Sequence, residues 1–250
     1  MALELTDRDL AVLLYTWQNR FVATRHLHRA FWPEASLPAA TQRLVTLREK
    51  GYLGFRSFPW LQERVLYFAS LEGNRALAKV GLLPEAYIHD YPRKPEESTP
   101  ALRHDLTVVD LRLALEETGA DGRTWVSDHQ LRLENRRRGV AVRVPDGVFE
   151  FEVEGRRGKG VLEFENAPYR RPRVAAILTR LRVHYPEHQV FIVTKSAARA
   201  AAFRTWAANV GVYADHPEQV VVADLADVAE KGLEAGFKDL MDQDCPGNTT

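Results

Sequence analysis

SLPAATQRLVTLREKGYLGFRSF, residues 36–58, changes its hydrophobic period partway along. Ser36 is a good helix N-cap, Pro38 suits a first helical turn, and apolar residues then recur at the spacing of a helix face. Gly51 ends that pattern, and the apolar residues from position 52 onward fit an extended strand. The stretch therefore predicts one helix that leads directly into the first strand of a β-hairpin.

Helices are also predicted ahead of this stretch, over residues 7–19 and 24–32, where Thr6 supplies an N-cap and Pro33 a stop. A second strand over residues 63–68 completes the hairpin around Pro59, and a closing helix follows over residues 70–77. Three helices and a β-ribbon in this order predict a winged helix-turn-helix domain over residues 1–81.

The outward side of the third predicted helix is polar and basic. Residues 1–81 hold 11 Lys and Arg against 7 Asp and Glu, a net charge of +4. One helix fits the major groove of B-DNA, which is about 12 Å wide, so we expect double-stranded DNA as the partner and a homodimer as the binding form. The same architecture also fits a protein–protein interface. We expect base contacts from Thr41, Gln42, Arg43 and Thr46, and phosphate contacts from Arg48, Lys50, Arg56 and Arg64.

The rest of the chain divides into a linker, an α/β domain and an acidic end. Residues 82–101 contain four prolines and a run of mixed charge, which indicates a linker. Residues 102–223 predict an α/β sandwich around a mixed sheet, and residues 224–250 an acidic helix with a frayed tail. The predicted helices cover residues 103–118, 171–184 and 197–209, and the predicted strands 125–133, 144–153, 160–166, 189–194 and 220–222.

Acidic and apolar side chains alternate along two neighbouring predicted strands of this domain. Asp146 lies near the start of one strand, on the face opposite its apolar residues, while Glu163 and Glu165 share one face of the next. Carboxylate oxygens are the ligands that Mg²⁺ prefers, so Asp146 and Glu163 are candidate metal ligands. With Glu165 they are the candidate catalytic residues of a Mg²⁺-dependent endonuclease, and Glu116 is a further candidate. The same alternation also fits the solvent-facing side of a sheet that holds no metal.

Pro145-Asp146 followed by Glu163-Phe164-Glu165 resembles the PD-(D/E)xK nuclease motif on its α-β-β-β-α-β core. That resemblance implies a restriction-endonuclease-like fold for the second domain. The last position of the motif is a lysine that polarises the attacking water, and here it is Glu165, so Lys159 or Lys195 would have to replace it. A domain that has lost cleavage but still contacts phosphates through its arginine clusters, residues 136–138 and 170–173, fits these residues best.

Taken whole, the chain resembles the replication-relaxation family of bacterial plasmid and mobile-element proteins. The motifs that carry the resemblance are the helix-turn-helix front, YFASLEG at residues 67–73, HDL at 104–106, and PDG at 145–147 ahead of LEFE at 162–165. The family implies sequence-specific DNA binding in the replication or maintenance of mobile DNA. The alternatives are the Mg²⁺-dependent endonuclease and a dimeric transcriptional regulator whose second domain serves dimerisation.

Several other classes of protein do not fit the sequence. No apolar run approaches the roughly 20 residues of a membrane span, and the N-terminus has no secretion signal, so we expect a cytoplasmic protein without a membrane partner. Cys245 is the only cysteine, which allows neither an internal disulfide nor a thiolate zinc cluster. No HExxH motif, Walker loop or nucleophile elbow occurs, and Mg²⁺ is predicted only for the endonuclease alternative.

Overall fold

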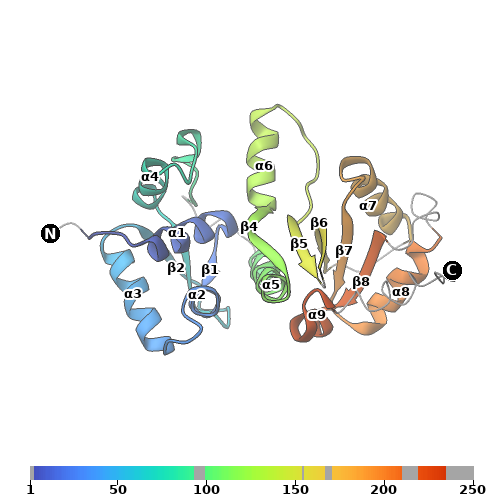
Figure 1. Cartoon of the computed structure of the whole chain (residues 1–250), viewed down its shortest axis with the longest axis horizontal. Helices are drawn as coiled ribbons and strands as arrows, with labels where there is room; N and C mark the ends of the chain where they lie inside the picture. The colour runs from blue at the N-terminus through green and yellow to red at the C-terminus, as the bar shows by residue number, and fades with distance from the viewer. Residues whose placement is uncertain (1–2, 93–98, 154, 167–170, 210–218, 235–250) are drawn as a thin grey trace. The chain divides into compact units, whose positions relative to one another are not determined.

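The computed structural model describes residues 3–92, 99–153, 155–166, 171–209 and 219–234. Within them the fold is α+β, with a three-stranded antiparallel sheet in one compact unit and a five-stranded mixed sheet in the other (Figure 1). The units are Met1–Val109 and Asp110–Thr250, so the division falls within helix α5 (Thr99–Glu117).

In the first unit, strand β3 lies between β1 and β2 and is antiparallel to both. The predicted helices and hairpin are confirmed to within about two residues at each end. The two-residue strand β1 was not predicted, because so short a strand carries no periodic signal. The elements are α1 (Asp7–Asn19), β1 (Val22–Ala23), α2 (Thr24–Phe31), α3 (Leu37–Glu49), β2 (Leu53–Ser57), β3 (Val65–Ala69), α4 (Leu71–Lys79) and the 3-10 helix η1 (Glu85–Tyr87).

Local sequence signals fix the helix starts of this unit. At α1 the backbone N–H of Thr6 donates to Asp9 Oδ2 at 2.8 Å, while the N–H of Asp9 donates to Thr6 Oγ1 at 3.2 Å, which is a capping box. At α4 the Ser70 hydroxyl accepts from the N–H of Gly73 at 3.1 Å. Gly73 lies so close to the carbonyl of Tyr52 that a Cβ there would overlap it, so glycine lets α4 pack closely.

Much of the predicted linker is packed structure. Leu83 is buried, and the side-chain amide of Asn74 donates to the carbonyls of Ile88 and Asp90 at 3.1 and 3.0 Å. At the far end, α5 begins at Thr99 and buries Leu102 in the apolar cluster of the first unit. Residues 93–98 lie outside the described part of the chain. Proline excludes helix and central strand but not burial, which is why composition alone overstated the linker.

The second unit is built on a sheet of order β4-β5-β6-β7-β8, in which β4, β5 and β6 are antiparallel neighbours and β6, β7 and β8 parallel ones. Its strands are β4 (Ala120–Ser127), β5 (Gly147–Val153), β6 (Arg156–Glu165), β7 (Gln189–Thr194) and β8 (Val220–Asp224). Its remaining helices are α6 (Asp128–Arg137), α7 (Arg171–His184), α8 (Ala197–Ala207) and α9 (Leu225–Lys231).

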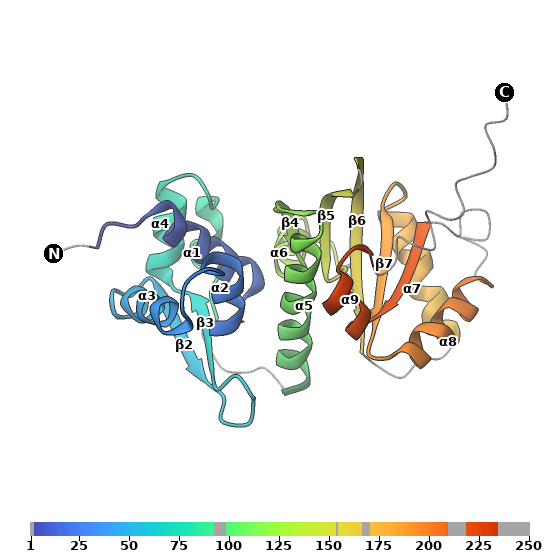
Figure 2. The same cartoon turned by 60° about the horizontal axis from the view of Figure 1, so that its bottom comes forward.

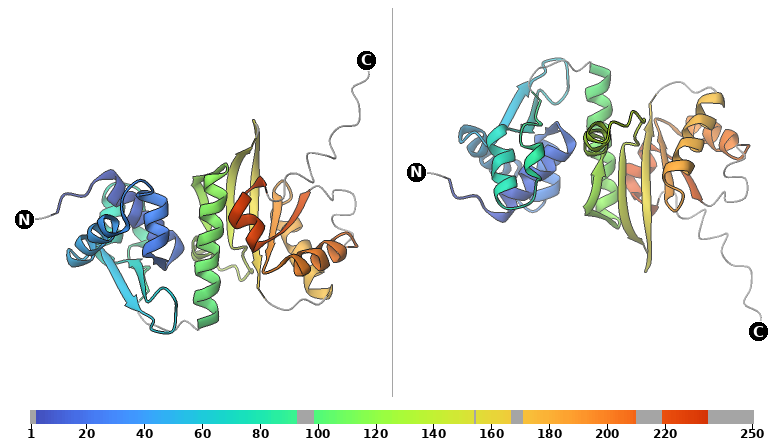
Figure 3. Two further views of the ribbon diagram at one scale, coloured as in Figure 1. Left: turned by 90° about the horizontal axis from the view of Figure 1, so that it is seen from below. Right: turned by 90° about the horizontal axis from the view of Figure 1, so that it is seen from above.

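Helices cover both faces of the parallel part of this sheet (Figures 2 and 3). On one face α7 and α8 bury Ile177 and Phe203 against Val161 and other strand residues. On the other face Leu115 of α5 and Val228 of α9 meet the opposite side chains of β7 and β8. Residues 160–165 of β6 are all buried, whereas Arg157 and Lys159 near the start of the strand are exposed, so only the second half of β6 has no solvent-facing side.

The predicted strand over residues 125–133 is wrong in its second half. Strand β4 ends at Ser127, and helix α6 begins at the next residue. The N–H of Ser127 donates to Gln130 Oε1 at 3.1 Å and the N–H of Gln130 to Ser127 Oγ at 3.3 Å. This S-x-x-Q capping box starts a helix where apolar residues alone resembled a strand.

The acidic end is described as far as residue 234. It contains α9, whose N-terminus is capped by Asp224: the backbone N–H groups of Ala226 and Asp227 donate to Asp224 Oδ1 at 2.9 and 3.1 Å. The predicted tail from residue 235 onward lies outside the described residues. None of the described helices combines the length and the apolar character that crossing a membrane demands.

Candidate functional site

Helix α3 presents a polar side that the first unit leaves uncovered. Its buried residues Ala40, Leu44 and Leu47 form the inner stripe, and Gln42 and Lys50 are exposed on the other side. The hydroxyls of Thr41 and Thr46 donate to carbonyls of their own helix, those of Leu37 and Gln42, at 2.8 and 3.0 Å. Both hydroxyl oxygens keep lone pairs that can accept a further hydrogen bond.

Arg43, by contrast, is turned toward helix α1. Its Nε donates to Asp9 Oδ1 at 2.8 Å, and its Nη2 is ion-paired with the other carboxylate oxygen. The Asp9 side chain is only 1% exposed, so this ion pair joins α3 to α1. Burial raises the pKa of the Asp9 carboxyl, but the hydrogen bonds from Arg43 and Thr6 outweigh burial and leave it below its ordinary 3.8. The Arg43 guanidinium, predicted to contact a base, is therefore already engaged in an ion pair that holds α3 against α1.

The four predicted phosphate contacts also divide into engaged and exposed side chains. The guanidinium of Arg48 lies over the ring of Phe55 at 4.9 Å. Arg56 lies over Phe68 at 5.5 Å and donates to the carbonyl of Pro92 at 2.9 Å, which leaves it a structural role within the first unit. Lys50 and Arg64 are exposed, one at the end of α3 and the other in the hairpin loop.

The hairpin carries exposed aromatic side chains that the sequence did not single out. Phe55 on β2 is 48% exposed and Trp60 in the loop 57% exposed. Beside them Arg25 of α2 pairs with Glu63 at 2.7 Å, which fixes the loop to the second helix. The alternation of inward and outward side chains along the hairpin could have predicted that Phe55 is exposed. Nothing in the sequence predicts that Trp60 lies outside the core.

In the second unit, strand register brings Asp146 beside Glu163. Asp146 directly precedes β5, and Gly147 pairs with Leu162 of β6. The Asp146 carboxylate accepts a hydrogen bond from the backbone N–H of Phe164 at 2.7 Å. Gly147 lies under the Trp125 ring, where a Cβ would overlap it, so the Pro-Asp-Gly turn needs its glycine. The convergence of these two carboxylates, expected from the sequence, is therefore present.

Glu163 is neutralised by arginines. Its side chain is 3% exposed, and its Oε1 accepts from Arg143 at 2.9 Å and from Arg180 of α7 at 3.1 Å. Burial, together with the negative charge of Asp146, raises the pKa of Glu163 to about 7, although both arginines act to lower it. Arg180 was missed, although its place between Ile177 and Leu181 on the inward stripe of α7 was a signal.

Glu165 has an arginine partner of its own. Arg173 donates to its two carboxylate oxygens, from Nε at 3.2 Å and from Nη2 at 3.0 Å. Both Glu163 and Glu165 are thus buried against the helix layer, and the expectation that they lie on a solvent face is wrong, because β6 is a central strand.

The lysines that could replace the missing motif residue lie in different places. Lys159 pairs in register with Glu150, toward the opposite end of β6 from Glu165. Lys195 directly follows Thr194, which is the register partner of Glu165 on β7, and it is exposed. Only Lys195 therefore lies at the carboxyl end of β6 and β7 where the carboxylates gather.

A divalent metal does not fit this arrangement. The Oε1 of Glu163 and both oxygens of Glu165 are held by guanidinium groups, and within the described residues no three His, Cys, Asp or Glu side chains are grouped to hold a metal. Glu116, the further candidate acid, is paired with Arg112 at 2.6 Å. The cluster, Asp146, Glu163 and Glu165 with Arg143, Arg173 and Arg180, is hereafter the carboxylate–arginine cluster. Arg143 and Arg173 are exposed, Glu163 and Glu165 are buried, and Asp146 is partly exposed.

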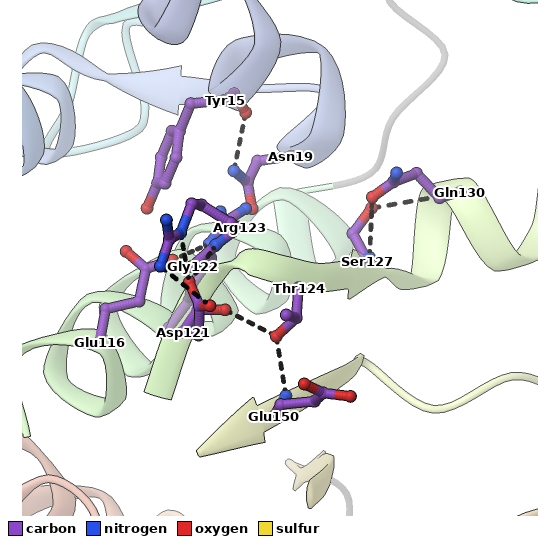
Figure 4. A network of polar contacts seen from close by, with 11 residues as sticks. Tyr15, Asn19, Glu116, Asp121, Gly122, Arg123, Thr124, Ser127, Gln130 and Glu150 are labelled. Atoms are coloured by element: carbon purple, nitrogen blue, oxygen red, sulfur yellow. Dashed lines mark hydrogen bonds and ion pairs between the residues drawn. The ribbon is translucent and has the colours of Figure 1, made fainter. Parts of the chain in front are cut away.

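The opposite end of the sheet holds a hollow of about 520 Å³ that Asp121, Arg123 and Glu150 help to line. These three residues belong to a network of polar contacts (Figure 4). Arg123 donates to Asp121 at 3.1 Å, Thr124 Oγ1 donates to the Asp121 carbonyl at 2.8 Å, and the N–H of Glu150 donates to Thr124 Oγ1 at 2.8 Å. These bonds tie β4 to β5 where their register shifts, so the network serves the sheet itself.

No protein-family model, curated protein or solved structure matches this chain. The replication-relaxation resemblance therefore stays a prediction.

Proposed function

We propose that this chain is a sequence-specific double-stranded DNA-binding protein, acting through helix α3 and the β2–β3 hairpin, with a second unit that is nuclease-like in fold and does not cut. The order α1-β1-α2-α3-β2-β3, with β3 between β1 and β2, supports a winged helix-turn-helix. The short connection between α2 and α3, residues 32–36, supports the same reading.

One observation carries this proposal: the side of α3 opposite its buried stripe is uncovered and exposes Gln42 and Lys50, beside the acidic Glu49 and the apolar Pro38 and Ala39. A helix that served only as packing would be covered on that side or would show an apolar contact surface. Instead Gln42 projects from the middle of the helix and Lys50 from its end, both exposed. Gln bonds bidentately to adenine in the major groove, and lysine bonds to phosphate.

The proposed contact set is smaller than the one expected from the sequence. Gln42, Thr41 and Thr46 are assigned to base edges, and Lys50 and Arg64 to phosphates. Arg43, Arg48 and Arg56 are assigned to the fold, because each already contacts a protein group. A helix-turn-helix commonly binds as a dimer, so we place a homodimer on two half-sites and the protein in the cytoplasm.

The second unit supports a nuclease-like domain without cleavage. Three antiparallel strands, a helix and a parallel strand, β4-β5-β6-α7-β7 after α5, follow the α-β-β-β-α-β order, with α6 inserted after the first strand. Arginines hold Glu163 and Glu165, and no lysine occupies the third motif position. From the resemblance to replication-relaxation proteins we propose that the DNA binding serves the replication or maintenance of mobile DNA.

Selection of bound sequences from a random duplex pool tests the binding proposal. The full chain should enrich a defined motif, and Gln42→Ala should enrich a weaker or different one. Lys79→Ala, which removes an exposed cation from α4 instead, serves as the matched control. Failure of the wild-type chain to enrich any sequence would refute the proposal.

Incubation with supercoiled plasmid tests the absence of cleavage. We expect the plasmid to stay supercoiled with Mg²⁺, with Mn²⁺ and with a chelator alike. Nicking that requires metal and disappears in Asp146→Ala would instead establish the endonuclease alternative.

A further inference from the structure

We propose that the carboxylate–arginine cluster of the second unit is a binding site for the DNA phosphate backbone, in which Arg143, Arg173 and Lys195 contact the phosphodiester. This inference rests on the proposed function, because it names a second DNA contact of the same protein. In a nuclease that cuts DNA, a metal ion would bind this phosphate; here the arginines would bind it instead.

The two arginines are built as oriented, outward-facing groups. Arg143 is 54% exposed and Arg173 41% exposed, although each bonds to a glutamate that is only 3% exposed. One edge of each guanidinium is therefore fixed by a buried carboxylate while other N–H groups reach solvent. Guanidinium groups have five N–H donors and match phosphate oxygens bidentately, so an arginine held in this way can still bind an anion.

The glutamates also set the spacing of the arginines. Glu163 and Glu165 are alternate residues of one strand, so their Cα atoms lie about 7 Å apart on one face. Lys195 follows the register partner of Glu165 on the neighbouring strand and adds an exposed cation at the same sheet edge. Positive groups thus gather at the carboxyl ends of β6 and β7, which is where ligands bind in open sheets of this kind.

The polar groups of the cluster are not all satisfied within the described protein. The Oε2 of Glu163 and the Nε of Arg180 are buried and have no hydrogen-bond partner among the described residues. A purely structural ion-pair network would be expected to satisfy such atoms, because an unpaired buried polar group is costly. The Arg180 Nε is a donor that a phosphate oxygen can satisfy, whereas the Glu163 Oε2 is an acceptor that needs a donor such as water.

Binding of full-length protein to a duplex of arbitrary sequence, measured by fluorescence anisotropy across a salt series with chelator, tests this inference. Each lost phosphate contact should reduce the slope of log affinity against log salt by about 0.9. We expect Arg143→Gln/Arg173→Gln to reduce the slope by about 2, and Arg123→Gln, a 92% exposed arginine elsewhere on the sheet, to leave it unchanged. An unchanged slope in the folded double variant would overturn the inference.

If the double variant does not fold, the single variant Lys195→Gln tests the same inference. Its side chain is exposed, and its removal leaves the buried glutamates paired with their arginines. It should reduce the slope by about 1, and a wild-type slope would overturn the inference. Inorganic phosphate at constant ionic strength should not displace the duplex. Displacement from the wild type but not from the Lys195 variant would assign the site to a small phosphate ligand and overturn the DNA assignment.

The failures of the two proposals are distinguishable. If the wild-type chain binds no DNA, the proposed function fails. If it binds, and Gln42→Ala loses site preference while the variants of the second unit keep the wild-type slope, the function stands and only the backbone site fails.

Discussion

Replacing Arg43 by alanine should unfold the first unit more easily rather than alter which sequence it binds. The guanidinium joins α3 to the buried carboxylate of Asp9 in α1. Removing one partner of a buried ion pair costs about 3–5 kcal/mol. Because the Arg43 side chain is 31% exposed, water recovers part of this, and we expect a loss of about 2–3 kcal/mol.

Thermal unfolding followed by tryptophan fluorescence measures this loss. For a domain of about 60–100 residues each kcal/mol shifts the midpoint by about 4–8 °C, so Arg43→Ala should lower it by about 8–24 °C. Gln42→Ala, one residue earlier and exposed, should change stability by no more than about 0.5 kcal/mol. An Arg43→Ala variant with the wild-type midpoint but altered DNA preference would refute this reasoning and restore Arg43 as a base contact.

The ion pair also sets the sign of a pH dependence. The pKa of Asp9 lies below its ordinary 3.8, so the stabilisation is fully present above that value and is lost as pH falls through the lowered folded-state pKa. The midpoints of wild type and Arg43→Ala should therefore converge as pH falls below about 4. A constant difference down to the acid limit would show that Arg43 stabilises by packing alone.

The second unit yields two further predictions. The pKa of Glu163, about 7, means that folding takes up a proton, so wild-type stability falls as pH rises from 4.5 to about 7; Glu163→Gln should remove that slope, and an unchanged slope would contradict the assignment. Gly147→Ala should cost about 1–3 kcal/mol, because its Cβ would overlap Trp125; the midpoint again measures it, and a neutral result would mean that the turn has room.

Helix and strand positions followed from the sequence wherever a local pattern is sufficient. Thr6, Ser36 and Gly51 mark helix ends by their own chemistry, and the predicted boundaries of α1 and α3 lie within about a residue of the observed ones. Residues 128–133, which were misread as strand, show the same rule, because their capping box was a stronger local signal than their apolar spacing.

The partners of individual side chains could not be predicted from the sequence, because they depend on which helices and strands pack together. Arg43 and Asp9 are 34 residues apart, and each alone looks like an exposed charge on an amphipathic helix. The alternation in β6 predicted one wet face, but the helix layers on both sides of the sheet bury Glu163 and Glu165. The convergence of Asp146 with Glu163 was predictable from strand parity, whereas the arginines that neutralise Glu163 were not.

The ratio of affinities for the selected duplex and a scrambled one most directly tests the claim that the outward side of α3 reads DNA. A lost bidentate base contact costs about 1–3 kcal/mol, so Gln42→Ala should reduce this ratio by roughly tenfold or more while its thermal midpoint stays at the wild-type value. Lys79→Ala should keep the wild-type ratio. If folded Gln42→Ala discriminates between the two duplexes as well as the wild type does, Gln42 is not a base contact and the outward side of α3 is not the reading surface.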